Sequence, residues 1–304
     1  MTIGLESLGL YLILQQYKLT SAIHIPQVAS AVTNNLSDES SLVRSYAASA
    51  ISVLPLQFRQ QYLAPLLDDP VRAVRIYAAS GLLDINPETL VPELQDQYFA
   101  ALAEYQASVS INSDIPSGRY QLAIDYHRQG QLKQAENSYL TTLKMDNHFN
   151  AARLNLAQLY YQQQRLDEVE QVYLKVIEQE PESDQAYYSL GLLYAEQGDL
   201  ESARQYLEQA AEKGQNPRAW YNLAVLHHQQ KKTERAEQYY LQALSFSPSE
   251  PDFIQGIYSL YAQQQKWQKL EKLIDESLLF EPGNQQLIQL KMSVQQERLK
   301  QSTR

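Results

Sequence analysis

Apolar and small side chains recur with a period of about 34 residues along most of the chain. Five stretches that begin at residues 116, 150, 184, 217 and 251 align at spacings of 34, 34, 33 and 34 residues. Their seventh position is aliphatic: Leu122, Leu156, Leu190, Leu223 and Ile257. Their eighth position is mostly small: Ala123, Ala157, Gly191, Ala224 and Tyr258. Their eleventh position is mostly tyrosine: Tyr126, Tyr160, Tyr194, His227 and Tyr261.

The second half of each stretch repeats a matching pattern. Position 20 holds Ala135, Val169, Ala203, Ala236 and Leu270, and position 24 holds Tyr139, Tyr173, Leu207, Tyr240 and Ile274. Positions 4, 7, 8 and 11 share one helical face, because residues three and four apart are neighbours on a helix. Small residues at 8 and 20 let two helices pack closely, and Pro181, Pro248 and Pro282 end the second helix. The pattern predicts an all-α fold, an α-solenoid of helix hairpins.

This register resembles the tetratricopeptide repeat. One stretch matches it with Trp220, Leu223, Ala224, Ala236, Tyr240, Ala243 and Pro248, and another with Tyr187, Leu190, Gly191, Tyr194, Gly198, Ala203 and Ala210. The resemblance implies a right-handed superhelix whose first helices line a concave groove. The fifth repeat departs from it, because Tyr258 and Leu270 stand where small residues belong. We expect its two helices to lie further apart or at a changed angle.

A different repeat precedes these five. Asp38, Val43, Arg44 and the segment 46–49 recur 31 residues later as Asp69, Val74, Arg75 and the segment 77–80. Each Asp is placed in a turn, where it can cap the helix that follows. The pattern resembles HEAT repeats, in which an Asp and an Arg form a ladder between neighbours. A weaker third copy is expected over residues 4–14.

The chain therefore divides into four predicted segments. Residues 1–86 are HEAT-like helical repeats. Residues 87–115 are adapter helices that form a partial tetratricopeptide unit. Residues 116–283 are five tetratricopeptide repeats, and residues 284–304 are a capping helix with a polar tail.

Candidate binding residues follow from the resemblance, because ligands of tetratricopeptide proteins usually contact positions 2, 5, 6, 9, 12 and 13. The candidates here are Tyr120, His127, Asn155, Gln158, Tyr161, Tyr188, Tyr221, Asn222 and His228. Tyrosine is enriched at binding hot spots, and an asparagine amide can donate to and accept from one peptide unit. Asn155 and Asn222 are the main candidates, with the alternative that both are solvated helix-surface residues. The carboxylate clamp for chaperone tails is not expected, because Tyr120 and Ile124 occupy two of its places.

Composition narrows the functional classes. The net charge of −10 argues against nucleic acid, which needs clustered Lys and Arg. The absence of cysteine excludes thiolate metal sites and covalent haem attachment, so we expect no cofactor and no metal. The apolar run 8–14 is too short to cross a bilayer and lacks a basic segment before it, so no membrane insertion or export signal is expected. No catalytic motif is present, and we expect no enzyme.

The leading hypothesis is a non-catalytic scaffold that binds a protein or peptide in the concave groove. The alternative is a structural appendage of a larger complex, because HEAT-like repeats followed by tetratricopeptide repeats resemble the C-terminal half of bacterial multihaem cytochrome c proteins. A cytoplasmic location is the default for this chain, and a periplasmic one follows if it belongs to such a cytochrome.

Overall fold

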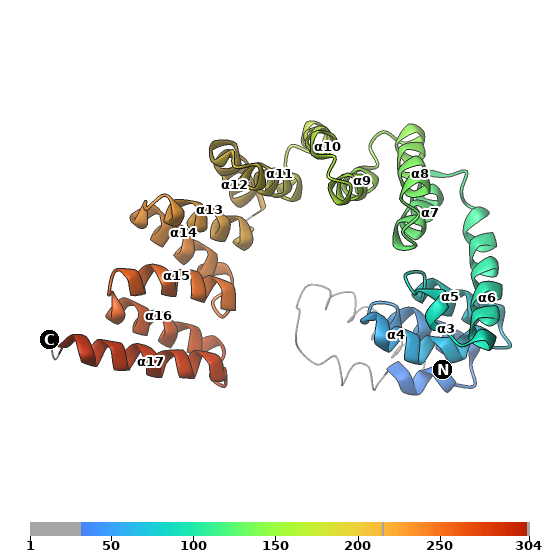
Figure 1. The fold of residues 1–304 in the computed structure, drawn as a ribbon, viewed down its shortest axis with the longest axis horizontal. Coiled ribbons are helices and arrows are strands. Elements are labelled where there is room, and N and C mark those ends of the chain that lie inside the picture. Colours follow the sequence, from blue (N-terminus) through green and yellow to red (C-terminus); the bar gives the residue numbers. More distant parts are fainter. Residues whose placement is uncertain (1–31, 215, 303–304) are drawn as a thin grey trace. The chain divides into compact units, whose positions relative to one another are not determined.

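The computed structural model describes residues 32–214 and 216–302, and within them every regular element is a helix. The expected repeat copy at residues 4–14 lies outside these ranges. The chain folds into two compact units, and the boundary between them lies between Asn155 and Leu156 (Figure 1). No described helix is long and apolar enough to cross a membrane.

The N-terminal unit contains both copies of the 31-residue sequence repeat and the first 34-residue repeat. Its elements are the 3-10 helix η1 (Asn34–Ser37), α3 (Ser41–Ile51), α4 (Leu56–Leu63), η2 (Ala64–Asp68), α5 (Arg72–Gly81), η3 (Pro87–Thr89), α6 (Pro92–Ser110), α7 (Pro116–Arg128), α8 (Leu132–Met145) and the start of α9 (Asn150–Gln162). One apolar core runs from Val32 to Tyr105 and includes Ala48 and Ala79 at 0% exposure. These two alanines come from the 31-residue repeat, where their small size allows α3 and α5 to pack together.

The Asp and Arg residues of the 31-residue repeat bind one another. Arg44 holds Asp69 through two hydrogen bonds, Nε to Oδ2 at 2.7 Å and Nη2 to Oδ1 at 3.0 Å. Arg75 continues the series by donating to Glu104 of α6 at 3.0 and 2.7 Å. Asp69 also accepts the backbone N–H of Val71 at 2.8 Å in the turn before α5. Charged side chains therefore link each helix pair to the next.

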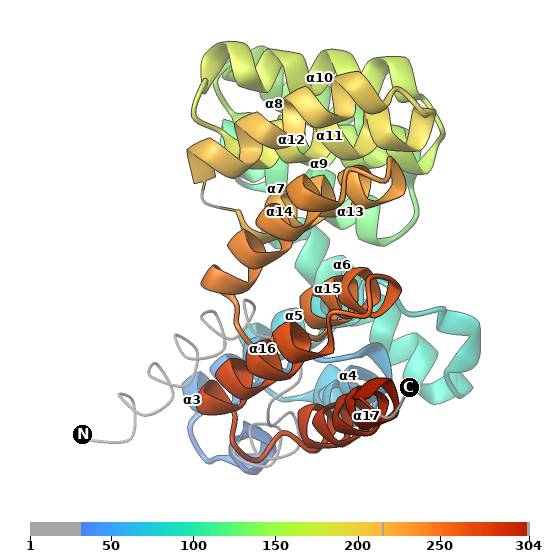
Figure 2. The ribbon, with the colours of Figure 1, turned by 90° about the vertical axis from the view of Figure 1, so that its left-hand side faces the viewer.

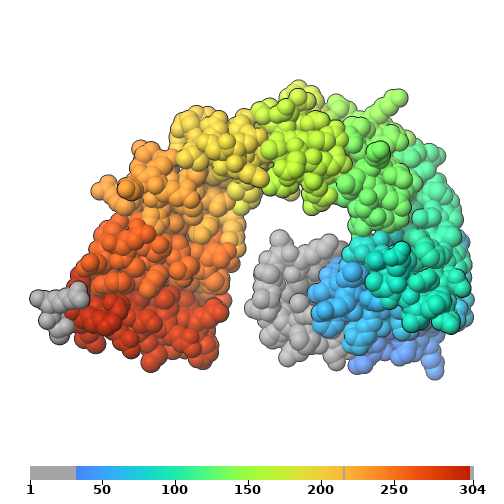
Figure 3. Space-filling model, viewed as in Figure 1, coloured from blue at the N-terminus to red at the C-terminus, as the bar shows by residue number. Residues whose placement is uncertain are grey.

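The C-terminal unit is a series of antiparallel helix pairs. It comprises the rest of α9, then α10 (Leu166–Gln179), α11 (Asp184–Gln197), α12 (Leu200–Gly214), α13 (Pro217–Gln229), α14 (Thr233–Phe246), α15 (Pro251–Gln263), α16 (Trp267–Phe280) and α17 (Gln285–Ser302). Figure 2 shows α15, α16 and α17 lying side by side, and the space-filling view in Figure 3 shows the atoms of this part of the chain (orange to red) in contact with one another. The helix starts at 116, 150, 184, 217 and 251 coincide with the repeat starts.

The turn inside each repeat has the same backbone conformation. Position 15 has a left-handed φ in all five repeats, at Gly130 (70°), Gln164 (59°), Gly198 (82°), Lys231 (59°) and Gln265 (53°). Glycine adopts this region without penalty, whereas a side chain makes it costly. The tertiary packing of the two helices therefore imposes the conformation in the three repeats without glycine.

Glutamates at position 21 connect successive repeats of the C-terminal unit. Each accepts a hydrogen bond from position 11 of the next repeat: Tyr194 Oη to Glu170 at 2.6 Å, Tyr261 Oη to Glu237 at 3.1 Å and Gln295 Nε2 to Glu271 at 2.8 Å. We call this series the glutamate ladder. It is interrupted once, where position 21 is Arg204 and the facing position 11 is His227.

His227 is buried with a relative exposure of 1%, and neither ring nitrogen has a hydrogen-bond partner among the described residues. Its ring stacks on Tyr239 at a centroid distance of 5.3 Å, and Trp220 stacks on the same Tyr239 at 5.6 Å. Burial lowers the pKa of His227, and the nearby cations Lys232 and Arg235 lower it further. His227 thus fills in the core the place that tyrosine holds at position 11 of the other repeats.

The helices of the fifth repeat, α15 and α16, lie further apart than α11 and α12 or α13 and α14, as expected. Leu270, at the position that is usually small, is buried at 0% exposure. The large side chain fills the space between the two backbones and keeps them apart.

Candidate functional site

Two of the candidate asparagines are bound to candidate tyrosines of the preceding repeat. Asn155 donates from Nδ2 to the hydroxyl of Tyr120 at 2.9 Å, and Asn222 donates to the hydroxyl of Tyr188 at 3.1 Å. All four side chains are half-buried. Burial raises the pKa of Tyr120, while the bond from Asn155 lowers it. Each bond uses one amide hydrogen, so each amide retains further hydrogen-bonding capacity.

The two candidate histidines occupy equivalent surroundings in different repeats. His127 Nδ1 lies 3.4 Å from the hydroxyl of Tyr139, and His228 Nδ1 lies 3.4 Å from the hydroxyl of Tyr240. In both cases the rings meet edge to face, at interplanar angles of 83° and 87°. His228 Nε2 also lies 3.3 Å from Oε1 of Gln263 in the next repeat.

A tyrosine at position 5 completes each histidine cluster. Tyr120 lies 6.2 Å from Tyr139 between ring centroids, and Tyr221 lies 5.8 Å from Tyr240. Repeats 1 and 4 therefore carry the same trio at positions 5, 12 and 24. The sequence pattern placed Tyr139 and Tyr240 in the core, which their exposures of 1% and 2% confirm. It did not indicate that their hydroxyls contact the histidines.

The remaining candidates lie at the surface of α9. Gln158 is exposed, and Tyr161 is 41% exposed. Tyr161 donates its hydroxyl proton to Oε2 of Glu196 at 2.8 Å, which joins position 12 of one repeat to position 13 of the next. His228 and Gln263 make the same connection two repeats later. Positions 5, 6, 12 and 13 thus carry a continuing set of polar contacts between first helices.

Position 6 of the fifth repeat tests how closely α15 packs against the tyrosine rings of the fourth repeat. Gly256 stands where Asn155 and Asn222 stand in other repeats, and an added Cβ would lie 2.5 Å from Tyr240 and 3.0 Å from Tyr221. We expect Gly256→Asn to lower the free energy of unfolding by about 1–2 kcal/mol, because buried rings would have to move. Urea unfolding followed by circular dichroism measures this. Ser259→Asn, on the same helix, is the control, and an equal loss in both variants would contradict the explanation.

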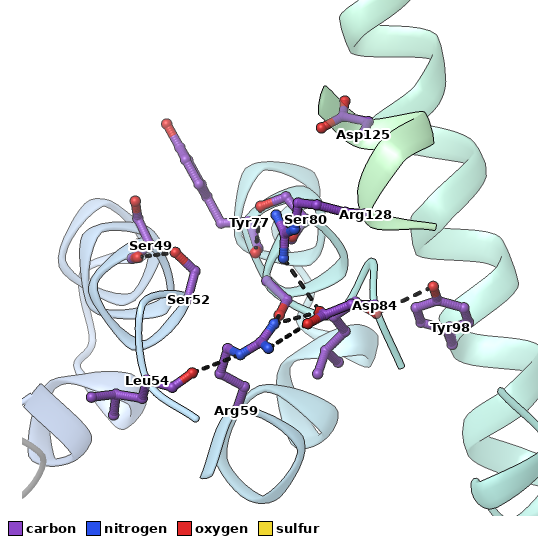
Figure 4. A network of polar contacts seen from close by, with 12 residues as sticks. Ser49, Ser52, Leu54, Arg59, Tyr77, Ser80, Asp84, Tyr98, Asp125 and Arg128 are labelled. Atoms are coloured by element: carbon purple, nitrogen blue, oxygen red, sulfur yellow. Dashed lines mark hydrogen bonds and ion pairs between the residues drawn. The ribbon is translucent and has the colours of Figure 1, made fainter. Parts of the chain in front are cut away.

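A second polar cluster joins the two kinds of repeat in the N-terminal unit (Figure 4). Arg59 of α4 is 7% exposed and holds both carboxylate oxygens of Asp84 at 2.6 Å. It also donates to the carbonyls of Leu54 at 2.8 Å and Gly81 at 2.6 Å. Arg128, at the end of α7, reaches the same region through the carbonyl of Ser80 at 3.0 Å. The bond from Arg59 keeps the pKa of Asp84 below its usual value.

The contact between α6 and α7 contains a buried carboxylate. Asp125 is 2% exposed and accepts hydrogen bonds from the Tyr105 hydroxyl at 2.7 Å and from Gln121 Nε2 at 3.0 Å. Burial raises the pKa of Asp125, while these two bonds lower it. Tyr105 and Ala101 are both buried on α6. The first helix of the first 34-residue repeat, α7, therefore packs directly on α6.

The family model that matches the chain covers residues 87–303 and describes the C-terminal domain of cilia and flagella-associated protein 70, a tetratricopeptide-type domain. The chain belongs to this family. The match includes all five repeats, α6 and α17. No curated protein matches the chain.

Solved structures of tetratricopeptide proteins share the fold. Tom70 from yeast aligns with a TM-score of 0.57 and 16% identity over 90% of this chain and 59% of its own. PilF from Pseudomonas aeruginosa aligns with a TM-score of 0.48 and 19% identity over 63% of this chain and 88% of its own. YrrB, whose title describes a TPR protein with an unusual peptide-binding site, aligns with a TM-score of 0.44 and 16% identity over 62% and 97%. Family membership and the Tom70 likeness establish a tetratricopeptide solenoid, a fold of protein-interaction scaffolds.

Proposed function

We propose that the chain is a non-catalytic scaffold that binds a protein or peptide segment on the faces of its first helices. The observation that carries this proposal is the repeated bond between Asn at position 6 and Tyr at position 5 of the preceding repeat. It holds the tyrosine ring and the amide side by side at the surface. Rings held in this way offer contact area with little loss of conformational entropy on binding.

The small number of charges at these positions supports a protein ligand rather than a phosphate-rich one. Within the C-terminal unit, Arg218 at position 2 is paired with Asp252 at 2.6 Å and Glu250 at 2.6 Å. Glu196 at position 13 accepts the Tyr161 hydroxyl. The other groove positions of this unit carry tyrosines, amides, serines and aliphatic side chains, together with His228 and Gly256. Such a face suits hydrogen bonding to peptide units together with apolar contacts.

We also propose the division into segments that the sequence predicts. Residues 1–86 form a HEAT-like part, residues 87–115 an adapter, residues 116–283 five tetratricopeptide repeats and residues 284–304 a cap. The contact of Arg44 with Asp69 supports the HEAT-like part, because this repeat family implies a ladder between the Asp and Arg of neighbouring repeats. Arg75 pairs instead with Glu104 of α6. The pairing of Asp125 with Tyr105 supports α6 as a half repeat.

These ion pairs also favour the second candidate function, a structural part of a larger complex such as a multihaem cytochrome c protein. A stiff N-terminal array that grows by adding repeats suits a spacer or a docking arm. The chain itself holds no cysteine for covalent haem attachment. Genomic DNA upstream that encodes CxxCH motifs would support this candidate, and an unrelated upstream gene would count against it.

We expect Asn222→Ala and Tyr188→Phe each to weaken capture of the partner about fivefold, because each removes the bond that orients the other side chain, worth about 1 kcal/mol. The measurement is affinity capture from native lysate with identification of the bound protein, followed by titration of that protein. Asn137→Ala, which changes an exposed asparagine on the second helix α8, is the matched control. Unchanged binding in both groove variants would refute the assignment of this face.

A further inference from the structure

A cavity of about 160 Å³ lies between α15 and α17, the first helix of the fifth repeat and the closing helix. Its floor is apolar and includes Ile254 and Leu287, which are 3% and 4% exposed, together with the half-buried Leu290. Gln255 lies at its rim and holds position 5, the position of Tyr221 in the preceding repeat. Leu290 holds position 6 of the stretch that begins at 285, the position of Asn222. The cavity therefore continues the row of groove positions to the C-terminal helix.

The rim of this cavity is polar, uncharged and partly fixed in place. Ser249 Oγ donates to Oε1 of Glu281 at 2.6 Å, and Asn284 Nδ2 donates to Oε2 of the same carboxylate at 2.8 Å. Asn284 Oδ1 also accepts the backbone N–H groups of Gln286 and Leu287 at 3.1 and 3.2 Å, which caps α17. These bonds hold Ser249 and Asn284 in place at the opening.

Two further amides at the rim remain available to a ligand. The side chains of Gln255 and Gln286 are exposed and form no hydrogen bond within the described residues. Each amide can donate to and accept from a peptide unit. No Lys or Arg lines the cavity, so an acidic side chain placed there would lose hydration without gaining a cationic partner.

We propose that this cavity binds one leucine side chain of the extended partner segment, with Gln255 and Gln286 holding the peptide units on either side. The volume fits, because an apolar protein cavity of about 150 Å³ accommodates a benzene molecule. This inference rests on the proposed function, since it places the bound segment on the same helix faces, and it adds the chemistry of the partner.

The test uses N-acetyl-leucine-N-methylamide, which carries one leucine side chain between two peptide units. Methyl NMR spectra of the full chain are recorded while this probe is added. We expect the methyl signals of Ile254, Leu287 and Leu290 to shift, and those of Leu140 on α8 to stay in place. N-acetyl-aspartate-N-methylamide should produce no shift in the same range. Equal shifts with both probes, or none with the leucine probe, would overturn the proposal.

Variants separate this site from the rest of the groove. Leu290→Trp should fill the cavity and weaken probe binding about tenfold or more, because a buried leucine contributes about 1.5–3 kcal/mol. Met292→Trp is the matched control, since Met292 lies on the same helix, is 60% exposed and does not line the cavity. Gln255→Ala changes an exposed side chain without risk to the fold and should weaken binding about threefold to tenfold.

Asn222→Ala should leave probe binding unchanged. If the probe binds but Asn222→Ala and Tyr188→Phe do not affect partner capture, leucine binding in the cavity is supported and the proposed groove is refuted. If capture depends on Tyr188 but the probe does not bind, partner binding in the groove is supported and leucine binding in the cavity is refuted.

Discussion

Replacing Arg59 by alanine should lower the free energy of unfolding of the N-terminal unit by about 3 kcal/mol. Arg59 is nearly buried and supplies four hydrogen bonds, two to Asp84 and one each to the carbonyls of Leu54 and Gly81 (Figure 4). Its removal leaves a carboxylate and two carbonyls without their donor, and the loss of a partner for buried polar groups is the costly part. Asp84 is partly exposed and keeps Arg128, which limits the loss.

Hydrogen exchange of the backbone amides of α4 and α5 measures this change directly, because it reports local opening without assuming a two-state transition. Arg72→Ala is the control, since Arg72 is exposed on α5 and should change stability by less than about 0.5 kcal/mol. The pKa of Asp84, held low by Arg59, should also rise in Arg59→Ala. Similar protection in Arg59→Ala and Arg72→Ala would show that the cluster does not join these helices.

The second large effect is expected from pH at His227. Burial, Lys232 and Arg235 lower the pKa of this histidine in the folded chain, whereas in the unfolded chain it is about 6.5. Arg204 of α12 acts in the same direction, and Glu208 of α12 opposes it. Between the folded and the unfolded pKa the unfolded chain binds more protons, so stability falls as the pH falls below about 6.5 and levels off below the folded pKa.

The slope of this loss is at most about 1.36 kcal/mol for each pH unit, and it is reached only where the unfolded histidine is protonated and the folded one is not. His227→Phe keeps the stacked ring and removes both nitrogens, so this variant should lack that part of the pH dependence. It should also be more stable at neutral pH by about 1 kcal/mol, because no unpaired nitrogen remains buried. Urea unfolding at several pH values compares the two proteins, with His228→Phe as the control. Parallel pH profiles for wild type and His227→Phe would refute the explanation.

The sequence alone predicts the fold because the same residue pattern recurs along the chain. A small residue recurs at position 8 in four repeats and a large apolar or tyrosine side chain recurs at position 24 in all five, and each recurrence constrains the same kind of helix pair. The wider separation of α15 and α16 was also predictable, since Tyr258 and Leu270 break the rule in both helices. The first helix of every repeat starts where the alignment placed it.

The contacts between repeats were harder to predict, because each depends on the geometry of two helices. Position 21 is glutamate in four repeats, yet its acceptance of a bond from position 11 becomes visible only when the helices are packed. The clustering of His127 with Tyr139 has the same origin. Arg59 and Asp84 lie outside both repeat patterns, so nothing in the sequence marked them. The roles of Asn155 and Asn222 in binding stay predictions, although the structure shows what orients them.

The glutamate ladder also bears on how such a chain can gain or lose length in evolution. Loss of residues 251–284 would bring Gln295 opposite Glu237, which now accepts from Tyr261, so an acceptor would still face a donor. Loss of residues 217–250 would instead bring Tyr261 opposite Arg204, so the glutamate of position 21 would be missing from that junction. The fifth repeat is thus an exchangeable module, whereas the fourth is tied to its neighbours by the one junction that departs from the common rule.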